Sequence, residues 1–231
     1  MFHSLEITTH ARFALTGVVL VTLLFSASAA RADDGLSRDD AATDARIERG
    51  FAVAPVPLNL RGKNRALVGL GSYLVNVTSD CDGCHSAGPE TEYLFGGIPY
   101  FVGQAVKAVN PATYLGGGRS FGMLAGPNSP EIVSRNLTPD KTGRPEGGRS
   151  FAEFLRIFRT GVDLDNAHPN CSATLTTNCF PPPWDGTRLQ VMPWPQYQDL
   201  TTHDIRAIYE YLGAIPCIAG PPSGILHNDC R

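Results

Sequence analysis

The sequence is low in charge and has no long uninterrupted apolar run. Only 18% of its residues are charged and the formal net charge is −3, which excludes a strongly basic nucleic-acid-binding protein and a disordered, highly charged chain. The longest apolar stretch runs over residues 13–25, and Thr16 and Thr22 interrupt it. A bilayer-spanning helix needs about 20 apolar residues, so this stretch is short for a transmembrane helix.

The same stretch has the pattern of an export signal. Basic residues precede it, and Ala30-Arg31-Ala32 offers an A-x-A cleavage site after it. We therefore expect residues 1–32 to be a signal peptide that is cleaved on export to the periplasm. The alternative is an uncleaved signal that anchors the protein to the outer face of the inner membrane. Cleavage makes the chain one charge more negative, and we expect the mature chain to have no membrane span and no nucleic-acid partner.

The sequence contains one C-x-x-C pair and no second one. Cys81 and Cys84 form the pair, and His85 follows directly. A structural zinc site needs two more ligands at similar spacing. A thioredoxin-like redox pair begins a helix after a buried strand, whereas this pair follows a predicted helix. Zinc and redox chemistry are kept as alternatives. C-x-x-C-H is the attachment site of c-type haem, where both thiols form thioethers with the haem and the histidine binds its iron. The pattern therefore predicts one covalently attached haem c.

The sixth iron ligand of such a haem is expected to be a methionine or a histidine far along the chain. We favour Met192, because the proline that follows it disfavours helix and presents the thioether from an extended loop. The alternatives are an open sixth position, Met123 in a glycine-rich segment, and three histidines: His168, His203 and His227.

Three amphipathic helices are predicted from apolar spacing and end signals. The first carries an apolar face over residues 67–77 and stops just before the cysteine pair. The second begins with a capping box, Ser150 with Glu153, and Gly161 suits its closing position. The third follows a threonine cap and spans about 201–213. The expected protein is mostly α-helical.

The segments outside these helices are expected to be loop-rich. Residues 88–149 place short apolar pieces between glycines and prolines, which favours two or three short strands or hairpins. Residues 163–186 form a proline-rich loop with two cysteines. We expect residues 33–60 to be a mobile polar arm, up to about residue 50, followed by an extended segment, and residues 61–231 to be one domain.

Four further cysteines make an even set in an exported chain, where thiols oxidise to disulfides. Three pairings are possible. We favour the two local ones, Cys171–Cys179 and Cys217–Cys230, on compartment and proximity.

The order of these motifs resembles the class I c-type cytochromes. The closer likeness is to exported bacterial cytochrome c modules that accompany dehydrogenases, over residues 65–216, and it rests on the segments GSYLV, SRNLTPD, FAEFLRIFRTG, VMPW and AIYEYLGAIP. The resemblance implies a cytochrome c-like fold of three main helices around one haem, with residues 88–149 as a loop-rich, partly β insertion. It also implies that the first and last helices cross closely, which would explain Gly69 and Gly71.

Carried over by position, the resemblance makes Cys81 and Cys84 the thioether residues, His85 the proximal iron ligand and Met192 the distal one. The implied function is electron transfer without enzymatic catalysis: a periplasmic monohaem cytochrome that carries single electrons between redox partners such as a dehydrogenase, an oxidase or another cytochrome. Modules of this kind often carry several haems, whereas this sequence has one motif. The alternative is a haem enzyme or gas sensor with an open sixth position.

Two further groups of residues have two interpretations each. By resemblance, the SRNLTPD segment gives polar support near the haem edge or its propionates; by composition, it is ordinary turn chemistry. Three aromatic residues either wall the haem crevice or fill the core. The first group is Arg135, Asn136 and Thr138, and the second is Trp184, Trp194 and Tyr197.

Overall fold

The computed structural model describes residues 39–104, 107–171 and 179–231. The expected signal peptide, residues 1–32, lies outside the described residues. The chain divides into two units, Met1–Ala45 and Arg46–Arg231. In the first unit, residues 39–45 are helical. No helix in the described part of the chain combines the length and the apolar character that crossing a membrane requires.

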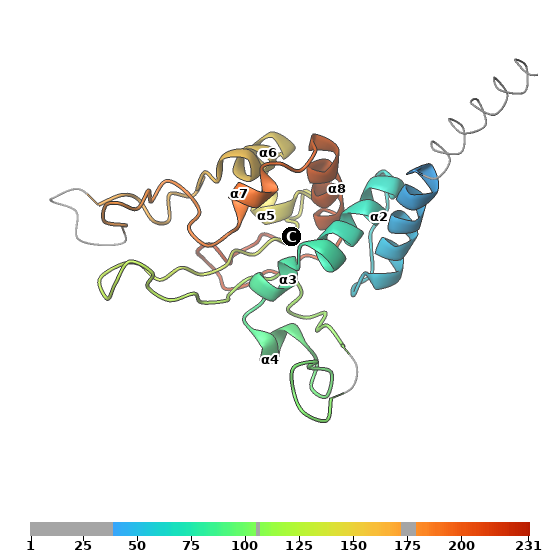
Figure 1. Ribbon diagram of the computed structural model, residues 1–231, viewed down its shortest axis with the longest axis horizontal. Helices are drawn as coiled ribbons and strands as arrows, with labels where there is room; N and C mark the ends of the chain where they lie inside the picture. Colours follow the sequence, from blue (N-terminus) through green and yellow to red (C-terminus); the bar gives the residue numbers. More distant parts are fainter. Residues whose placement is uncertain (1–38, 105–106, 172–178) are drawn as a thin grey trace, which may run out of the picture. The chain divides into compact units, whose positions relative to one another are not determined.

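The second unit is mostly helical, with short helices around three longer ones (Figure 1). Its first helical stretch ends at residue 53. The elements that follow are α2 (Arg65–Tyr73), which continues as the π-helical turn η1 (Leu74–Thr78), α3 (Cys81–Cys84), α4 (Pro89–Glu92), α5 (Pro145–Gly148), α6 (Phe151–Thr160), α7 (Trp194–Tyr197) and α8 (Thr202–Leu212).

The three longer helices are the three that the sequence predicts, and their end signals are formed. At α6, the Ser150 hydroxyl accepts from the Glu153 N–H while the Glu153 carboxylate accepts from the Ser150 N–H. Gly161 closes α6 with a left-handed φ of 64°. The Thr201 hydroxyl accepts from the Asp204 N–H at the start of α8. These local interactions fix where each helix begins and ends.

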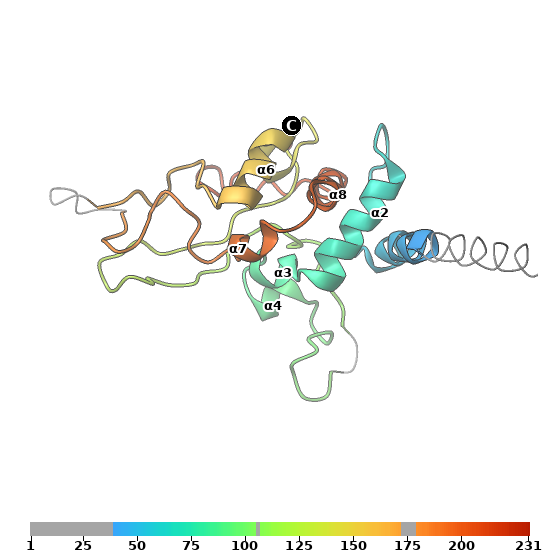
Figure 2. The ribbon, with the colours of Figure 1, turned by 45° about the horizontal axis from the view of Figure 1, so that its top comes forward.

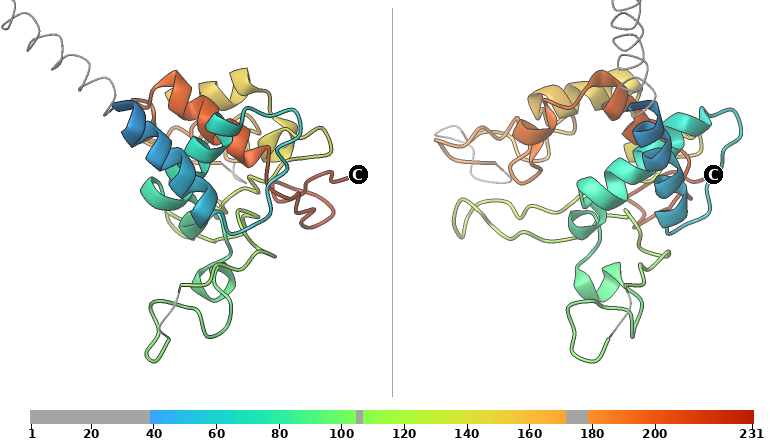
Figure 3. Two further views of the ribbon diagram at one scale, coloured as in Figure 1. Left: turned by 90° about the vertical axis from the view of Figure 1, so that its right-hand side faces the viewer. Right: turned by 45° about the vertical axis from the view of Figure 1, so that its right-hand side comes forward.

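Residues 46–53, at the end of the expected arm and the start of the expected extended segment, are helical. This helix packs against α2 (Figure 3). A Cβ atom at Gly50 would lie 1.8 Å from the Gly69 carbonyl oxygen, and one at Gly69 would lie 2.7 Å from both Ile47 and Phe51. The contact rests on glycines rather than on a broad apolar stripe, which is why helical periodicity did not reveal it.

Helices α2 and α8 cross in close contact (Figures 1 and 3). A Cβ atom at Gly71 would lie 1.9 Å from the Ala207 carbonyl oxygen. The close crossing therefore explains Gly71, as the resemblance implies, whereas Gly69 faces the helix over residues 46–53.

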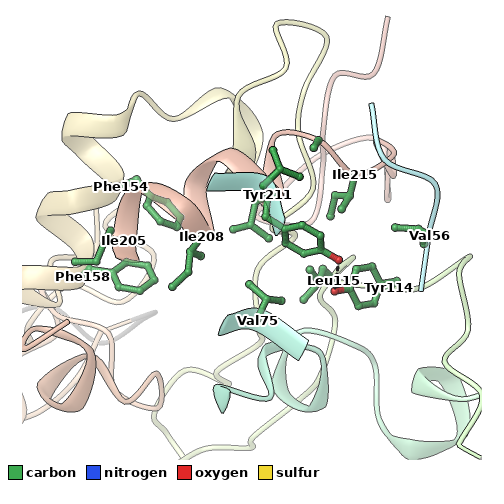
Figure 4. Packing of buried hydrophobic residues seen from close by; sticks show 13 residues of the cluster. Val56, Val75, Tyr114, Leu115, Phe154, Phe158, Ile205, Ile208, Tyr211 and Ile215 are labelled. Carbon is green, nitrogen blue, oxygen red and sulfur yellow. Dashed lines mark hydrogen bonds between the residues drawn. The ribbon is translucent and has the colours of Figure 1, made fainter. Parts of the chain in front are cut away.

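The core packs α6 and α8 against α2, η1 and the segment around residue 115 (Figure 4). Within it lies a closed set of three hydrogen-bonded side chains. The Tyr114 hydroxyl donates to Asn76 Oδ1 at 2.6 Å and lies 2.9 Å from the Tyr211 hydroxyl. Asn76 Nδ2 donates to the Tyr211 hydroxyl at 3.2 Å. The triad joins η1 to α8, and because each partner is satisfied its burial carries little penalty.

The insertion over residues 88–149 forms two hairpin-like loops and, within the described residues, only isolated β-bridges. The bridges join Tyr93 to Val109 and Ser120 to Val133, both antiparallel. The expected short strands are absent from these described residues because glycines with positive φ, such as Gly122 at 73°, break the ladders early. The tips of both loops expose large apolar side chains: Leu94, Phe95, Tyr100, Phe101, Val102, Met123 and Leu124.

Both favoured disulfides are formed, Cys171–Cys179 and Cys217–Cys230. The second closes a segment, residues 217–230, that we call the C-terminal loop. It packs against residues 136–141, where the Lys141 ammonium pairs with the Asp229 carboxylate at 2.6 Å. Cys81 and Cys84 form no disulfide.

Candidate functional site

One cavity of the second unit contains the sequence-predicted site. Its empty space is about 1440 Å³, part of which is open to solvent. Helices α3, α6, α7 and α8 contribute to its walls, and the segment over residues 188–193 closes one side. Helices α3 and α7, which both carry lining residues of the cavity, lie close to each other in Figure 2.

The cavity brings together Cys81, Cys84, His85 and Met192. The first three reach it from one short turn. Asp80 precedes that turn with a left-handed φ of 46°, which redirects the chain between η1 and α3. Residues at i, i+3 and i+4 share one face of a helical turn, so C-x-x-C-H presents both sulfurs and the imidazole to the same space.

His85 is held in one orientation and one tautomer. Its Nδ1 lies 2.8 Å from the backbone carbonyl oxygen of Arg135, and a carbonyl only accepts, so Nδ1 carries the proton. Burial, and after it the nearby Arg135 charge, lowers the pKa of His85, while the carbonyl hydrogen bond opposes the shift. The imidazole is therefore neutral, with the Nε2 lone pair free, which is the form that binds a metal.

The two thiols of the motif are kept protonated. Burial, followed by the Asp80 carboxylate, raises the pKa of Cys81 to about 12. Burial also raises the pKa of Cys84, and the Arg119 guanidinium opposes that shift. A neutral thiol is a poor disulfide nucleophile and a poor zinc ligand. In the described part of the chain, no group of three or more His, Cys, Asp or Glu side chains is arranged to hold a metal ion.

Met192 reaches the cavity from a non-helical segment between Gln190 and α7, as expected from the proline after it. Its partly buried side chain packs on the hydrophobic core. The other candidates for the sixth iron ligand differ in whether they line the cavity. Met123 is 55% exposed at a hairpin tip, and it does not line the cavity, nor do His203 and His227. His168 does line it.

Most of the remaining wall is apolar. Phe154, Ile157 and Phe158 come from α6, and α8 adds Ile208 and Leu212. The second hairpin of the insertion contributes another group, Phe121, Ile132 and Val133. The insertion therefore shields the cavity through this hairpin, whereas the loop over residues 94–104 takes no part in its lining.

The three residues singled out in the SRNLTPD segment have two different surroundings: one lines the cavity, and two contact the C-terminal loop. Arg135 lines the cavity and pairs with Asp163 at 2.5 Å and with Asp165 at 3.0 Å. Asn136 and Thr138 do not line it. Both are buried, and both hydrogen-bond to the C-terminal loop instead. Support next to the haem edge therefore fits Arg135 alone.

Of the three aromatic residues singled out from the sequence, one lines the cavity and two do not. Tyr197 lines the cavity, and its hydroxyl donates to the Ser79 carbonyl at 3.2 Å, which joins α7 to the chain before the C-x-x-C-H motif. Trp194 lies against Gly161 at the end of α6, and Trp184 is 38% exposed. Neither tryptophan lines the cavity.

Glu146 is among the cavity residues that sequence reasoning missed. It sits in α5 with a left-handed φ of 51°, inside the sequence Pro-Glu-Gly-Gly. Burial raises the pKa of Glu146 to about 7, although the Arg135 and Arg149 charges lower it. Only the fold places this carboxyl group in the wall, since a single glutamate beside two glycines reads as a surface turn.

These residues fit a c-type haem. The cavity is largely apolar, the two unpaired thiols and the imidazole share one wall, and a thioether is available from another segment. The strongest single sign is the His85 hydrogen bond, because it engages Nδ1 and leaves Nε2, the metal-binding nitrogen, without a hydrogen-bond partner among the described residues.

Comparison with known proteins gives one distant relative. The chain is 24% identical over 149 residues to the fructose dehydrogenase cytochrome subunit of Gluconobacter japonicus. The match covers 64% of this chain and 21% of that protein, so the chain corresponds to about a fifth of its relative's length. No family model matches the chain, and no solved structure matches it. The chain is thus distantly similar to a cytochrome.

Proposed function

We propose that this protein is an exported monohaem c-type cytochrome that carries single electrons between redox partners. The observation that carries the proposal is the meeting of Cys81, Cys84, His85 and Met192 at one cavity, although 107 positions of sequence separate the last two. When bound, the haem supplies the one-electron chemistry of its iron. Side chains of this protein would hold the haem and set its surroundings.

The cysteines and the histidine have separate tasks. Cys81 and Cys84 would hold the haem covalently through thioether bonds. His85 would bind the iron through Nε2, because Nδ1 is committed to the Arg135 carbonyl. That hydrogen bond also sets the rotation of the ring, and it makes the imidazole a stronger electron donor.

Met192 is the residue that would offer the second iron ligand. Its thioether is neutral and, together with an imidazole, would favour the ferrous state. Since both ligands would come from the protein, substrate would have no position at the metal, so the arrangement suits electron transfer and not catalysis. The apolar walls from α6 and the second hairpin would limit the access of water to the haem, which favours a higher reduction potential.

The redox partner is proposed from the name of the distant relative, and the cellular compartment from the disulfide-bonded cysteines. The name of that relative identifies it as the cytochrome subunit of a dehydrogenase, so we propose a dehydrogenase as the electron donor of this protein. Two disulfides indicate an oxidising compartment, which supports the periplasm together with the expected signal peptide.

Absorption spectra of the exported protein test this function. Oxidised and reduced spectra are recorded for wild type, Met192→Ala, His168→Ala and, as the matched control, Met123→Ala at the exposed hairpin tip. We expect a c-type spectrum with the weak far-red band of ferric iron bound to thioether sulfur. Only Met192→Ala should abolish that band.

Other results would replace the proposal. A high-spin wild-type protein that takes up carbon monoxide at once would indicate an open sixth position, and so a haem enzyme or sensor. Loss of the native spectrum only in His168→Ala would make that histidine the ligand. Complete absence of haem from exported protein would return the motif to zinc or redox chemistry.

A further inference from the structure

The His85 ring depends on a backbone carbonyl that is itself held from two sides. On one side lies Gly117, with a φ of 75°, whose N–H donates to the His85 carbonyl at 2.7 Å. A Cβ atom at Gly117 would lie 2.5 Å from the Arg135 carbonyl carbon and 2.6 Å from its oxygen. The Arg135 carbonyl therefore rests directly against the Gly117 backbone.

The side chain of Asn136 holds the other side, where it anchors the Arg135–Asn136 peptide to the C-terminal loop. Its Nδ2 donates to the Ile218 carbonyl at 2.7 Å and to the Leu226 carbonyl at 3.2 Å. Its Oδ1 accepts from the Thr138 N–H at 2.9 Å and from the Thr138 hydroxyl at 2.7 Å. Both amide protons and two acceptor positions are thus used, which is the full capacity of the group.

The C-terminal loop adds further buried polar contacts to the same segment. The Ile218 N–H donates to the Thr138 hydroxyl at 3.0 Å. Asn228 Nδ2 donates to the Thr138 carbonyl at 2.8 Å and to the Pro139 carbonyl at 2.9 Å. Asn136, Thr138 and Asn228 are 3%, 0% and 2% exposed. A buried network of this kind rigidifies a region and fixes one arrangement.

We propose that Asn136 is a positioning residue: by tying the segment over residues 135–139 to the disulfide-closed C-terminal loop, it sets the hydrogen bond from His85 Nδ1 to the Arg135 carbonyl and thereby the reduction potential. The inference rests on the proposed function, because it assumes that His85 binds haem iron. A firm hydrogen bond makes the imidazole more basic and stabilises ferric iron. Loosening the Arg135 carbonyl weakens that bond, so the potential rises.

The test compares Asn136→Ala with Asn110→Ala in the haem-loaded protein. Asn110 is a matched control, since among the described residues its Oδ1 accepts only a local backbone hydrogen bond, from the Ala112 N–H at 3.1 Å, outside the C-terminal loop. Potentiometric titration should show a higher midpoint potential for Asn136→Ala than for wild type. The potential of Asn110→Ala should equal that of wild type, and both variants should retain the far-red band.

A second variant covers the case in which Asn136→Ala does not fold. Cys217→Ser/Cys230→Ser opens the C-terminal loop and leaves Asn136 in place, and it should raise the potential in the same direction. Unchanged potentials in folded, low-spin variants would overturn the positioning role while leaving the proposed function intact. A wild-type protein without haem, or without the far-red band, would instead overturn the proposed function itself.

Discussion

Gly71 in α2 lies directly against the backbone of Ala207 in α8. A Cβ atom at position 71 would stand 1.9 Å from the Ala207 carbonyl oxygen and 2.8 Å from the Tyr211 Cβ atom. Backbone lies on both sides of this contact, so rotation of a flexible side chain cannot relieve it. The crossing of α2 and α8 therefore depends on the absence of a side chain at residue 71.

Gly71→Ala is accordingly expected to destabilise the protein. Forcing one methyl group into a packed contact typically costs about 1–3 kcal/mol, and the displaced α8 also carries two residues of the cavity wall, Ile208 and Leu212. Denaturant unfolding of the haem-loaded protein measures the loss. Gly116→Ala is the control, because a Cβ atom there would meet its nearest neighbour, the Thr113 carbonyl oxygen, at 3.3 Å. Equal losses in both variants would contradict the argument.

The parts of the fold that the sequence predicts are those with local causes. The capping box of Ser150 and Glu153 joins groups three residues apart, and C-x-x-C-H gathers its three side chains within one turn. Both can be read without knowing the fold. The close crossing at Gly71 was also expected, but through resemblance and not from the spacing of residues.

The parts of the fold that the sequence does not predict depend on contacts between residues far apart in the chain. Asn136 reads as a turn residue, and only the C-terminal loop, 82 positions later, gives its amide the Ile218 carbonyl as a partner. Gly69 has no local signal for its contact with Phe51. Glu146 enters the cavity wall through a left-handed backbone conformation, which no pattern of apolar residues indicates.

Removal of the motif thiols should abolish covalent attachment without opening the disulfides. In Cys81→Ser/Cys84→Ser, we expect no haem to stay with the polypeptide after denaturation, as judged by haem staining of a denaturing gel. Cys171→Ser/Cys179→Ser is the matched control, because it removes a disulfide and should keep the stain. Retention of covalent haem in the first variant would show that other residues attach it.

Asp82, inside the motif, should make stability depend on pH. It is 7% exposed, its Oδ1 accepts from the Leu115 N–H at 2.8 Å, and its Oδ2 has no hydrogen-bond partner among the described residues. Burial raises the pKa of Asp82 from 3.8 to about 7, with the Glu92 carboxylate adding to the rise and the Leu115 N–H opposing it. The folded state therefore holds a proton that the unfolded chain releases between these pH values.

The difference in the pKa of Asp82 between the folded and the unfolded state sets the direction in which stability changes with pH. The stabilisation is complete below about pH 4 and is lost as pH rises to about 7, since ionising the buried carboxyl costs free energy; the loss is on the order of 2–4 kcal/mol. Asp82→Asn keeps the Oδ1 acceptor and cannot ionise. Its free energy of unfolding should therefore change less between pH 5 and pH 8 than that of wild type. Parallel pH profiles for the two proteins would rule out this role for Asp82.

Glu146 should make the reduction potential depend on pH, because it lines the cavity and its pKa is raised by burial to about 7. The charges that act on it are those of Arg135, Arg149, Asp163 and Asp165. An ionised carboxylate beside the haem stabilises the additional positive charge of ferric iron. The midpoint potential should therefore fall as pH rises through 7, by an amount on the order of 1 kcal/mol, or tens of millivolts.

Glu146→Gln removes the titrating proton and keeps the size of the side chain. Potentiometric titrations from pH 5.5 to pH 8.5 should show a flatter profile for this variant, with a potential close to that of wild type at the acid end. Glu131→Gln, at an exposed position outside the cavity, should keep the wild-type slope, because solvent screens its charge. A slope that survives in Glu146→Gln would assign the proton to another group, such as a haem propionate. A slope lost in Glu131→Gln as well would indicate a general surface-charge effect, and Glu146 would have no special part in the redox chemistry.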